Sequence, residues 1–292
     1  MLRQSLELIA KFPAIVAFAY IAMRHKFYGE PLFIDSLQKK FDIASSFLYM
    51  LRPEGKFSSL EAQLLDLALI LHAEHGGGNN SSFTMHVVTS SHADTYSSFS
   101  AALDSLKGPL HGAANENVMD MRRNIKDNLR DWTDQEEVAA YIEKILMKQA
   151  PNPTGLVYGM GYAAYAKSDP RAVNLKQKAK ELVISKNRLD EYDLYQTIEE
   201  MTPQIFERVK KSDKPIAANV DLHSGFVYDM LAFPQEIYTP LFAMGRMAGW
   251  AANRIDELIN GGRIVRPAYK NVGEVQDYIS MEQRGENSKF KN

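Results

Sequence analysis

The 292-residue sequence contains no cysteine. Without a thiol there is no disulfide framework, no thiolate nucleophile and no thiolate metal site. The absence fits a reducing compartment, and we expect a cytoplasmic protein. The sequence also has little net charge, because 34 lysine and arginine residues balance 36 aspartate and glutamate residues. Nucleic acids and anionic membranes are bound through concentrated positive charge, so neither is expected as a partner.

Long apolar runs are scarce as well. The most apolar stretch near the start, residues 12–23, is little over half of the ~20 residues that span a bilayer, and Lys11 and Arg24 bracket it. A signal peptide is the competing interpretation, because a short apolar run follows Arg3. Glu7 and Lys11 interrupt that candidate region. We expect a buried helix here and no membrane span.

Alternating runs of β-branched residues, which are typical of strands, are nearly absent, and helix signals dominate the sequence. Ser58 and Glu61 form a capping pair ahead of apolar residues at helical spacing. The triple glycine at 76–78 cannot continue a helix, so this helix should end near His75.

Three further helix starts are predicted. Asp169 precedes a proline that suits the first helical position, Thr133 pairs with Glu136, and Thr239 opens a long helix that closes at residues 260–262. We therefore expect an all-α protein whose lobes pack closely, since no long linker separates two halves.

Three of the seven histidines lie beside predicted helix breaks: His72, His75 and His111. His111 stands between two glycines at the mouth of the next helix, whose dipole lowers the pKa of an imidazole and favours its neutral, donating form. A histidine satisfied by a local carbonyl is the commoner outcome at a turn. His72, Glu74 and His75 also suggest zinc, but zincin histidines are four residues apart, so we expect no metal site.

Asp221 lies in a mostly apolar segment that leads into a predicted helix, where an aspartate commonly serves only as a cap. Arg171, Arg246 and Arg266 are far apart in the sequence. Arginines in such places usually pair with carboxylates of the protein itself. Three that converge would instead bind a di- or tricarboxylate ligand.

Together these residues form motifs that resemble those of the citrate synthase family, in order and spacing, from about residue 2 to residue 270. The motifs are HAEH at 72–75, GPLHGAAN at 108–115, GMG at 159–161 with SDPR at 168–171, NVD at 219–221 with SG at 224–225, and Arg246 with RP at 266–267. Any one of them is a weak signal, whereas five in register are a strong one.

The resemblance implies a multi-helical homodimer with a large helical domain and a smaller inserted one. We expect residues 1–111 and 229–292 to form the large, dimer-forming domain, and residues 112–228 to form a mobile small domain on the CoA side. The implied activity is that of an acyltransferase, which condenses acetyl-CoA or propionyl-CoA with oxaloacetate or a related 2-oxo acid, as in the tricarboxylic acid cycle. A coenzyme A thioester is then a co-substrate, and no cofactor is bound permanently.

The resemblance also implies roles for individual residues. Asp221 is the general base that takes the α-proton of the thioester, and His111 donates a hydrogen bond to the thioester oxygen as the enolate develops. His75 holds the oxo acid, while Arg171 and Arg246 bind its carboxylates.

Further roles are implied at the edges of the site. Arg266 reaches across the dimer to the ligand of the second subunit. The loop that contains Val157, Gly159 and Gly161 approaches CoA through backbone groups, and Lys214 meets a CoA phosphate.

Two departures from the family pattern bear on function. Tyr162 stands where the family has a histidine that polarises the carbonyl of the oxo acid. A phenol donates a hydrogen bond but stays neutral to about pH 10 and is longer than an imidazole, so we expect an altered catalytic site around Tyr162. Family members also usually carry a further segment before the part that matches Leu2. The alternative is therefore a family-derived protein without synthase activity, which binds a carboxylate or a CoA ester as a sensor or partner.

Overall fold

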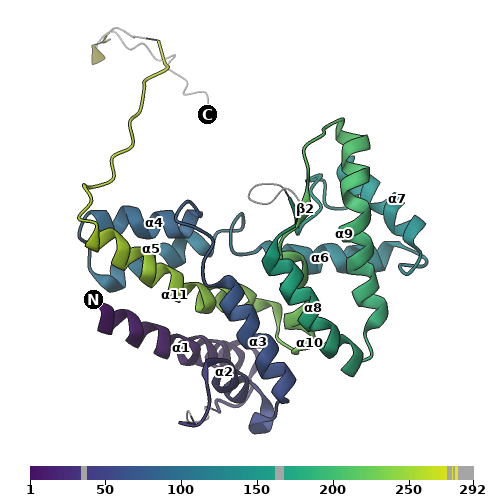
Figure 1. Ribbon diagram of the computed structural model, residues 1–292, viewed down its shortest axis with the longest axis horizontal. Helices are drawn as coiled ribbons and strands as arrows, with labels where there is room; N and C mark the ends of the chain where they lie inside the picture. Colours follow the sequence, from purple (N-terminus) through teal and green to yellow (C-terminus); the bar gives the residue numbers. More distant parts are fainter. Residues whose placement is uncertain (34–37, 162–167, 275–277, 279, 282–292) are drawn as a thin grey trace.

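The computed structural model describes residues 1–33, 38–161, 168–274, 278 and 280–281 (Figure 1). Tyr162 lies outside the described residues. The helices are α1 (Leu2–Tyr28), α2 (Ile43–Leu51), η1 (Pro53–Gly55), α3 (Ser59–His72), α4 (Asn80–Ser90), α5 (Thr95–Leu106), α6 (Ala114–Asn128), α7 (Gln135–Leu146), α8 (Pro170–Ser185), α9 (Leu189–Lys210), α10 (Val220–Met230), η2 (Gln235–Ile237) and α11 (Tyr238–Ile259). Two short strands, β1 (Met160–Gly161) and β2 (Ala217–Ala218), pair antiparallel. The prediction of an all-α protein is confirmed.

The helices lie in two groups. Figure 1 shows α1–α5 and α11 on one side, α6–α10 on the other, and the chain after α11 running away from both. Helix α3 packs against α8 and α10, so it joins the two groups. The domain limits after residue 111 and before residue 229 stay a prediction.

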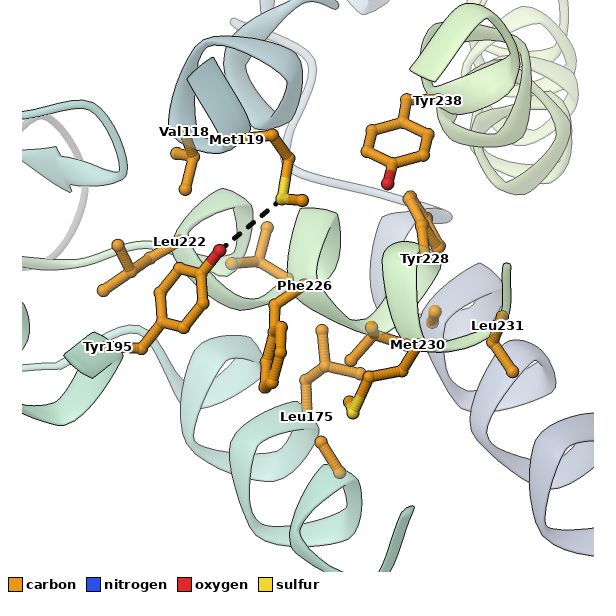
Figure 2. Packing of buried hydrophobic residues seen from close by; sticks show 14 of the residues in the cluster. Val118, Met119, Leu175, Tyr195, Leu222, Phe226, Tyr228, Met230, Leu231 and Tyr238 are labelled. Atoms are coloured by element: carbon orange, nitrogen blue, oxygen red, sulfur yellow. Dashed lines mark hydrogen bonds between the residues drawn. The ribbon is translucent and has the colours of Figure 1, made fainter. Parts of the chain in front are cut away.

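The main hydrophobic core runs through both groups. Tyr195 and Phe226 are buried at its centre, and the Tyr195 hydroxyl donates to the sulfur of Met119 at 3.5 Å (Figure 2). A second core lies between α4, α5 and α11, where Phe99 and Trp250 are buried. Each large apolar side chain removed from water contributes ~1.5–3 kcal/mol to stability. This burial holds α10 and α11 in place, and both helices carry residues of the site described below.

The capping pair at the start of α3 is confirmed. Ser58 Oγ accepts the Glu61 amide at 3.2 Å, and Glu61 Oε2 accepts the Ser58 amide at 2.8 Å. The helix ends at His72, three residues earlier than expected, because the carboxylate of Glu74 takes the backbone amides of His75 and Gly76. A side chain therefore ends this helix before the glycines do.

The predicted helix starts have mixed outcomes. Asp169 caps α8 as expected, since its carboxylate accepts the Arg171 amide at 2.9 Å. The prediction of Thr133 as a cap is wrong, because the cap of α7 is Asp134. Thr133 instead gives its amide and hydroxyl protons to Asp131.

Helix α1 is longer and more exposed than expected. It buries only Ser5, Pro13, Val16 and Ala17, so the prediction of a buried helix is wrong. Among the described residues it is the one helix long and apolar enough to cross a membrane, with a mean hydropathy of 1.8 over a window that is 22% buried. One such helix is weak evidence for a membrane span, because core helices of soluble proteins and signal sequences share its length and hydropathy. That residues 12–23 do not span a membrane stays a prediction.

Candidate active site

Asp221 lies in the first turn of α10 and leaves the capping to its neighbour. The side chain of Asn219 accepts the Asp221 amide at 3.0 Å. The Oδ1 atom of Asp221 is buried and has no hydrogen-bond partner among the described residues. Burial raises the pKa of this carboxyl to about 6, although the charges of Arg171 and Arg246 oppose the shift. Such a group is ionised at neutral pH and is a stronger base than an exposed aspartate.

The loop before β1 packs directly against the start of α10. The Gly159 carbonyl accepts the Asn219 amide at 2.9 Å. Gly159 has a φ of +80°, and a Cβ there would lie 2.8 Å from the Cα of Leu222, so only glycine fits. Val157 is buried, whereas a Cβ at Gly161 would meet no atom of the described residues within 4 Å. The loop predicted to approach CoA is thus adjacent to the predicted base.

Arg246 is fully buried on α11. Its Nε donates to the carbonyl of His72 at 2.6 Å, and its Nη1 donates to Oδ1 of Asn79 at 3.1 Å. Its Nη2 is buried without a partner among the described residues. Burial lowers the pKa of Arg246 to about 10, which still leaves the group charged at neutral pH. A buried guanidinium with an unused donor is suited to a carboxylate ligand, which would offset the cost of its burial.

Arg171 pairs with a carboxylate of the protein itself. Its Nη2 lies 2.7 Å from Oδ2 of Asp169, and its side chain is 14% exposed. The charges of Arg171 and Arg246 also lower the pKa of His75, in addition to the larger effect of burial. His75 therefore lies within the electrostatic reach of both arginines.

His111 lies in the turn before α6, close to α4. Its Nε2 is 3.0 Å from Oγ of Ser81, which also accepts the indole N–H of Trp250 at 3.2 Å. Burial, followed by the charge of Arg246, lowers the pKa of His111, so its imidazole is neutral at neutral pH, as predicted. The ring of Phe242 lies 6.2 Å from that of His111, between centroids.

His72 is fully buried, and burial lowers its pKa to about 3. Its ring packs on Phe242, with 4.5 Å between centroids, and neither ring nitrogen has a hydrogen-bond partner in the described part of the chain. Since Glu74 is engaged with backbone amides, these two residues do not form a zinc site with His75. Within the described ranges, no group of three or more histidine, cysteine, aspartate or glutamate residues is placed to hold a metal.

The structure brings together most of the predicted site residues. The charge of Arg246 acts on Asp221, His75 and His111, and that of Arg171 acts on Asp221 and His75. The roles of Lys214 and Arg266 stay predictions. Lys214 is exposed on the connection before β2, and Arg266 is exposed in the segment after α11 (Figure 1).

Three residues of the site escaped the sequence prediction. Asn79 and Ser81 contact Arg246 and His111, and their signal was a pair of polar residues just after the glycine hinge. Tyr228 has a buried hydroxyl without a partner among the described residues, and burial and the charge of Asp221 raise its pKa. Its pattern in the sequence is that of an ordinary core residue, so nothing in the spacing distinguishes it.

Comparisons with known proteins identify the family of this chain. Residues 1–268 match the family model of the citrate synthase C-terminal domain. Citrate synthase 2 of Bacillus subtilis (strain 168) is 35% identical over 283 residues, which cover 97% of this chain and 68% of the relative. 2-Methylcitrate synthase 1 of Corynebacterium glutamicum is 31% identical over 276 residues, which cover 92% and 65%.

A solved structure extends the similarity to the fold. The ternary complex of citrate synthase from Thermoplasma acidophilum with carboxymethyl coenzyme A and oxaloacetate is similar to this chain, with a TM-score of 0.77 and 28% identity over 96% of this chain and 68% of that one. The chain thus spans about two thirds of the length of these relatives. The family match over most of the chain leads to one conclusion: the chain belongs to the citrate synthase family.

Proposed function

We propose that this protein condenses an acyl-CoA, either acetyl-CoA or propionyl-CoA, with oxaloacetate or a related 2-oxo acid, and then hydrolyses the thioester. Its relatives include a citrate synthase and a 2-methylcitrate synthase. The observation that carries the proposal is the buried Oδ1 of Asp221, which has no hydrogen-bond partner among the described residues and lies within the electrostatic reach of Arg171 and Arg246. The CoA thioester is a co-substrate, and the proposed reaction uses no permanently bound cofactor.

In the first step, Asp221 removes the α-proton of the thioester. The electron pair of the broken C–H bond moves toward the thioester oxygen, which becomes an enolate oxygen. An α-proton is a far weaker acid than a carboxylic acid, so the step requires a fixed donor at that oxygen. His111 supplies it: when Ser81 donates to Nε2, the neutral ring carries its proton on Nδ1.

In the second step, the enolate carbon attacks the carbonyl carbon of the oxo acid and forms the new C–C bond. Arg246 has a guanidinium nitrogen that no described residue occupies and that could bind a carboxylate, and the charges of Arg171 and Arg246 both act on His75. The oxo oxygen takes up a proton, for which Tyr162 is the candidate that the sequence offers. Water then cleaves the C–S bond and releases CoA and the hydroxy acid.

The test is the release of free thiol from acetyl-CoA or propionyl-CoA in the presence of oxaloacetate. We expect turnover that Asp221→Asn lowers by ~10²–10⁴-fold. A wild-type rate equal to that of the variant would remove the synthase proposal. Stabilisation against heat by CoA esters or dicarboxylates without turnover would then identify the binding protein of the alternative.

The role of Tyr162 has a test of its own. A large gain in turnover for Tyr162→His would identify the tyrosine as the cause of weakened activity. A loss would show that the phenol is part of an altered site. Either outcome decides between a weakened and a redirected synthase.

A further inference from the structure

A chain of hydrogen bonds ties the backbone at His75 to α11. Oε1 of Glu74 accepts the backbone amide of His75 at 2.7 Å and that of Gly76 at 2.6 Å. Oε2 of the same carboxylate accepts the side-chain amide of Asn253 at 2.8 Å. Glu74 therefore fixes two successive peptide groups with one oxygen and is anchored to a buried helix by the other.

The surroundings of Asn253 determine which way its amide points. Its Nδ2 also donates to the carbonyl of Gly249 at 2.8 Å, so both neighbours on that side are acceptors. Its Oδ1 must then face Nε2 of His86, which lies 3.0 Å away. The reverse orientation would set the amide oxygen against a carboxylate and a carbonyl.

His86 completes the chain from α4. Its Nδ1 lies 2.9 Å from Oε2 of Glu257, and the two side chains are 20% and 18% exposed. An acceptor therefore faces each ring nitrogen of His86. The pair of His86 and Glu257 holds the Asn253 amide in the orientation that Glu74 needs.

Close packing at two glycines also fixes the loop that contains His75. A Cβ at Gly249 would overlap the carbonyl oxygen of Ala73 and would lie 2.8 Å from Oε2 of Glu74. A Cβ at Gly77 would lie 3.1 Å from Nε2 of His86. The loop thus rests directly on α11 and α4, with no room for side chains at these contacts.

We propose that Glu74 and Asn253 are positioning residues, which fix the backbone at His75 and thereby aim its imidazole at the oxo acid. His86 and Glu257 support them by fixing the Asn253 amide. None of these four side chains is assigned to either substrate. This inference rests on the proposed function, in which His75 holds the oxo acid, and it assigns the oxo-acid step rather than the thioester step to this network.

The kinetic test uses Glu74→Gln and Asn253→Asp. Glu74→Gln places two side-chain amides opposite each other, so the hydrogen bond between positions 74 and 253 loses its acceptor. Asn253→Asp places two carboxylates opposite each other, so the same bond loses its donor. Each should raise KM for oxaloacetate by ~10-fold or more, because a misplaced binding group loses its aligned contact, with KM for the acyl-CoA within about twofold of wild type. The double variant again pairs one donor with one acceptor between the two positions, while the oxygen introduced at position 253 still faces the carbonyl of Gly249, so it should recover part of the lost affinity.

Two controls accompany these variants. Asn260→Ala removes an asparagine from the exposed end of the same helix, where its partner is Asp256, and Glu207→Gln removes an exposed carboxylate from α9. Both should leave both KM values unchanged. Equal changes in both KM values and in kcat for Glu74→Gln, without recovery in the double variant, would overturn the proposal in favour of a merely structural role.

A second readout needs no turnover. We expect hydrogen exchange at the amides of His75 and Gly76 to be ~10-fold or more faster in Glu74→Gln and Asn253→Asp than in wild type, and to slow again in the double variant. Unchanged exchange would overturn the positioning role even in an active enzyme. Faster exchange in a protein that neither binds oxaloacetate nor releases thiol would leave the positioning of the loop intact and refute the proposed function.

Discussion

At the scale of single residues, Asp221 shows a conflict between chemistry and stability. Its Oδ1 atom is buried in the first turn of α10, and the side chain does not cap the helix, because Asn219 provides the cap. The motif predicted that Asp221 serves as a base, but not that a neighbour would free it from capping. Asn79 and Ser81 escaped prediction for a related reason, since their roles depend on contacts with the distant Arg246 and His111.

The raised pKa of Asp221 predicts the acid limb of the pH profile. The base acts only when ionised, and its pKa in the free protein is about 6. We expect kcat/KM to fall ~10-fold per pH unit below about pH 6. Initial rates between about pH 3.5 and pH 8.5 measure it, with circular dichroism as a check on folding. An acid limb near pH 4 would show that burial does not raise the pKa of the Asp221 carboxyl.

The same shift predicts that removing the base stabilises the fold. The folded pKa lies above the ordinary 3.8, so the folded state binds the proton more tightly, and stability is lost as pH rises from about 4 through about 6. At pH 7.5, Asp221→Asn should raise the free energy of unfolding by ~1–2 kcal/mol, which is less than the full shift implies because the residue is partly exposed.

Urea denaturation of Asp221→Asn and wild type at pH 7.5 and pH 4 makes the comparison. The difference should vanish at pH 4, where wild-type Asp221 is protonated in the folded state. A variant less stable than wild type at pH 7.5 would contradict the prediction.

At the scale of elements, local signals located helices well and their ends less well. The capping pair of Ser58 and Glu61 and the cap at Asp169 depend only on residues within one turn, so the local sequence is enough to predict these helix starts. The end of α3 depends instead on Glu74, whose carboxylate is held by Asn253 of a helix far along the chain. The exposure of α1 depends on what surrounds it, which a local pattern does not contain.

The loop before β1 gives a prediction at this scale. Gly159→Ala introduces a strained φ and a Cβ that presses on Leu222, next to Asp221. We expect a loss of ~1–3 kcal/mol of unfolding free energy and a lower kcat, because the start of α10 must move. Gly161→Ala is the matched control, since its Cβ would meet no atom of the described residues within 4 Å. Equal stabilities of the two variants, measured by urea denaturation, would contradict the argument.

At the scale of the whole molecule, Glu61 connects separate parts of the chain. Its carboxylate accepts from Arg52 at 2.9 Å and from Lys186 at 3.0 Å, while Arg52 also reaches the carbonyl of Leu231. The sequence showed Glu61 only as a member of the Ser58 capping box, because its two cationic partners are brought to it by the fold.

This junction predicts a dependence of stability on pH. Burial alone would raise the pKa of Glu61, but hydrogen bonds from Arg52, Ser58 and Lys186 outweigh it and lower the pKa to about 2 from 4.5. Its contribution is present above about pH 4.5 and is lost as pH falls toward 2. Glu61→Gln should cost on the order of 2 kcal/mol at pH 7 and much less near pH 2.5, as measured by urea denaturation. An equal cost at both pH values would contradict the charge-based explanation.

The homodimer that the family resemblance implies predicts rescue between two inactive variants. If Arg266 completes the site of the partner subunit, Asp221→Asn and Arg266→Ala are each inactive, but a mixed dimer has one intact site. Unfolding and refolding the two together should restore about a quarter of wild-type activity, since half of the dimers are mixed and half of their sites are intact. No rescue, with dimers confirmed by light scattering, would place Arg266 in its own subunit's site or outside both.

The sequence contains two tryptophans, and the buried indole of Trp250 donates to Ser81, the hydroxyl that also contacts His111. The protein thereby possesses a built-in optical probe one hydrogen bond away from a residue of the site. In a Trp132→Phe background, a change in emission wavelength or intensity on titration would report ligand arrival at His111 without any added dye.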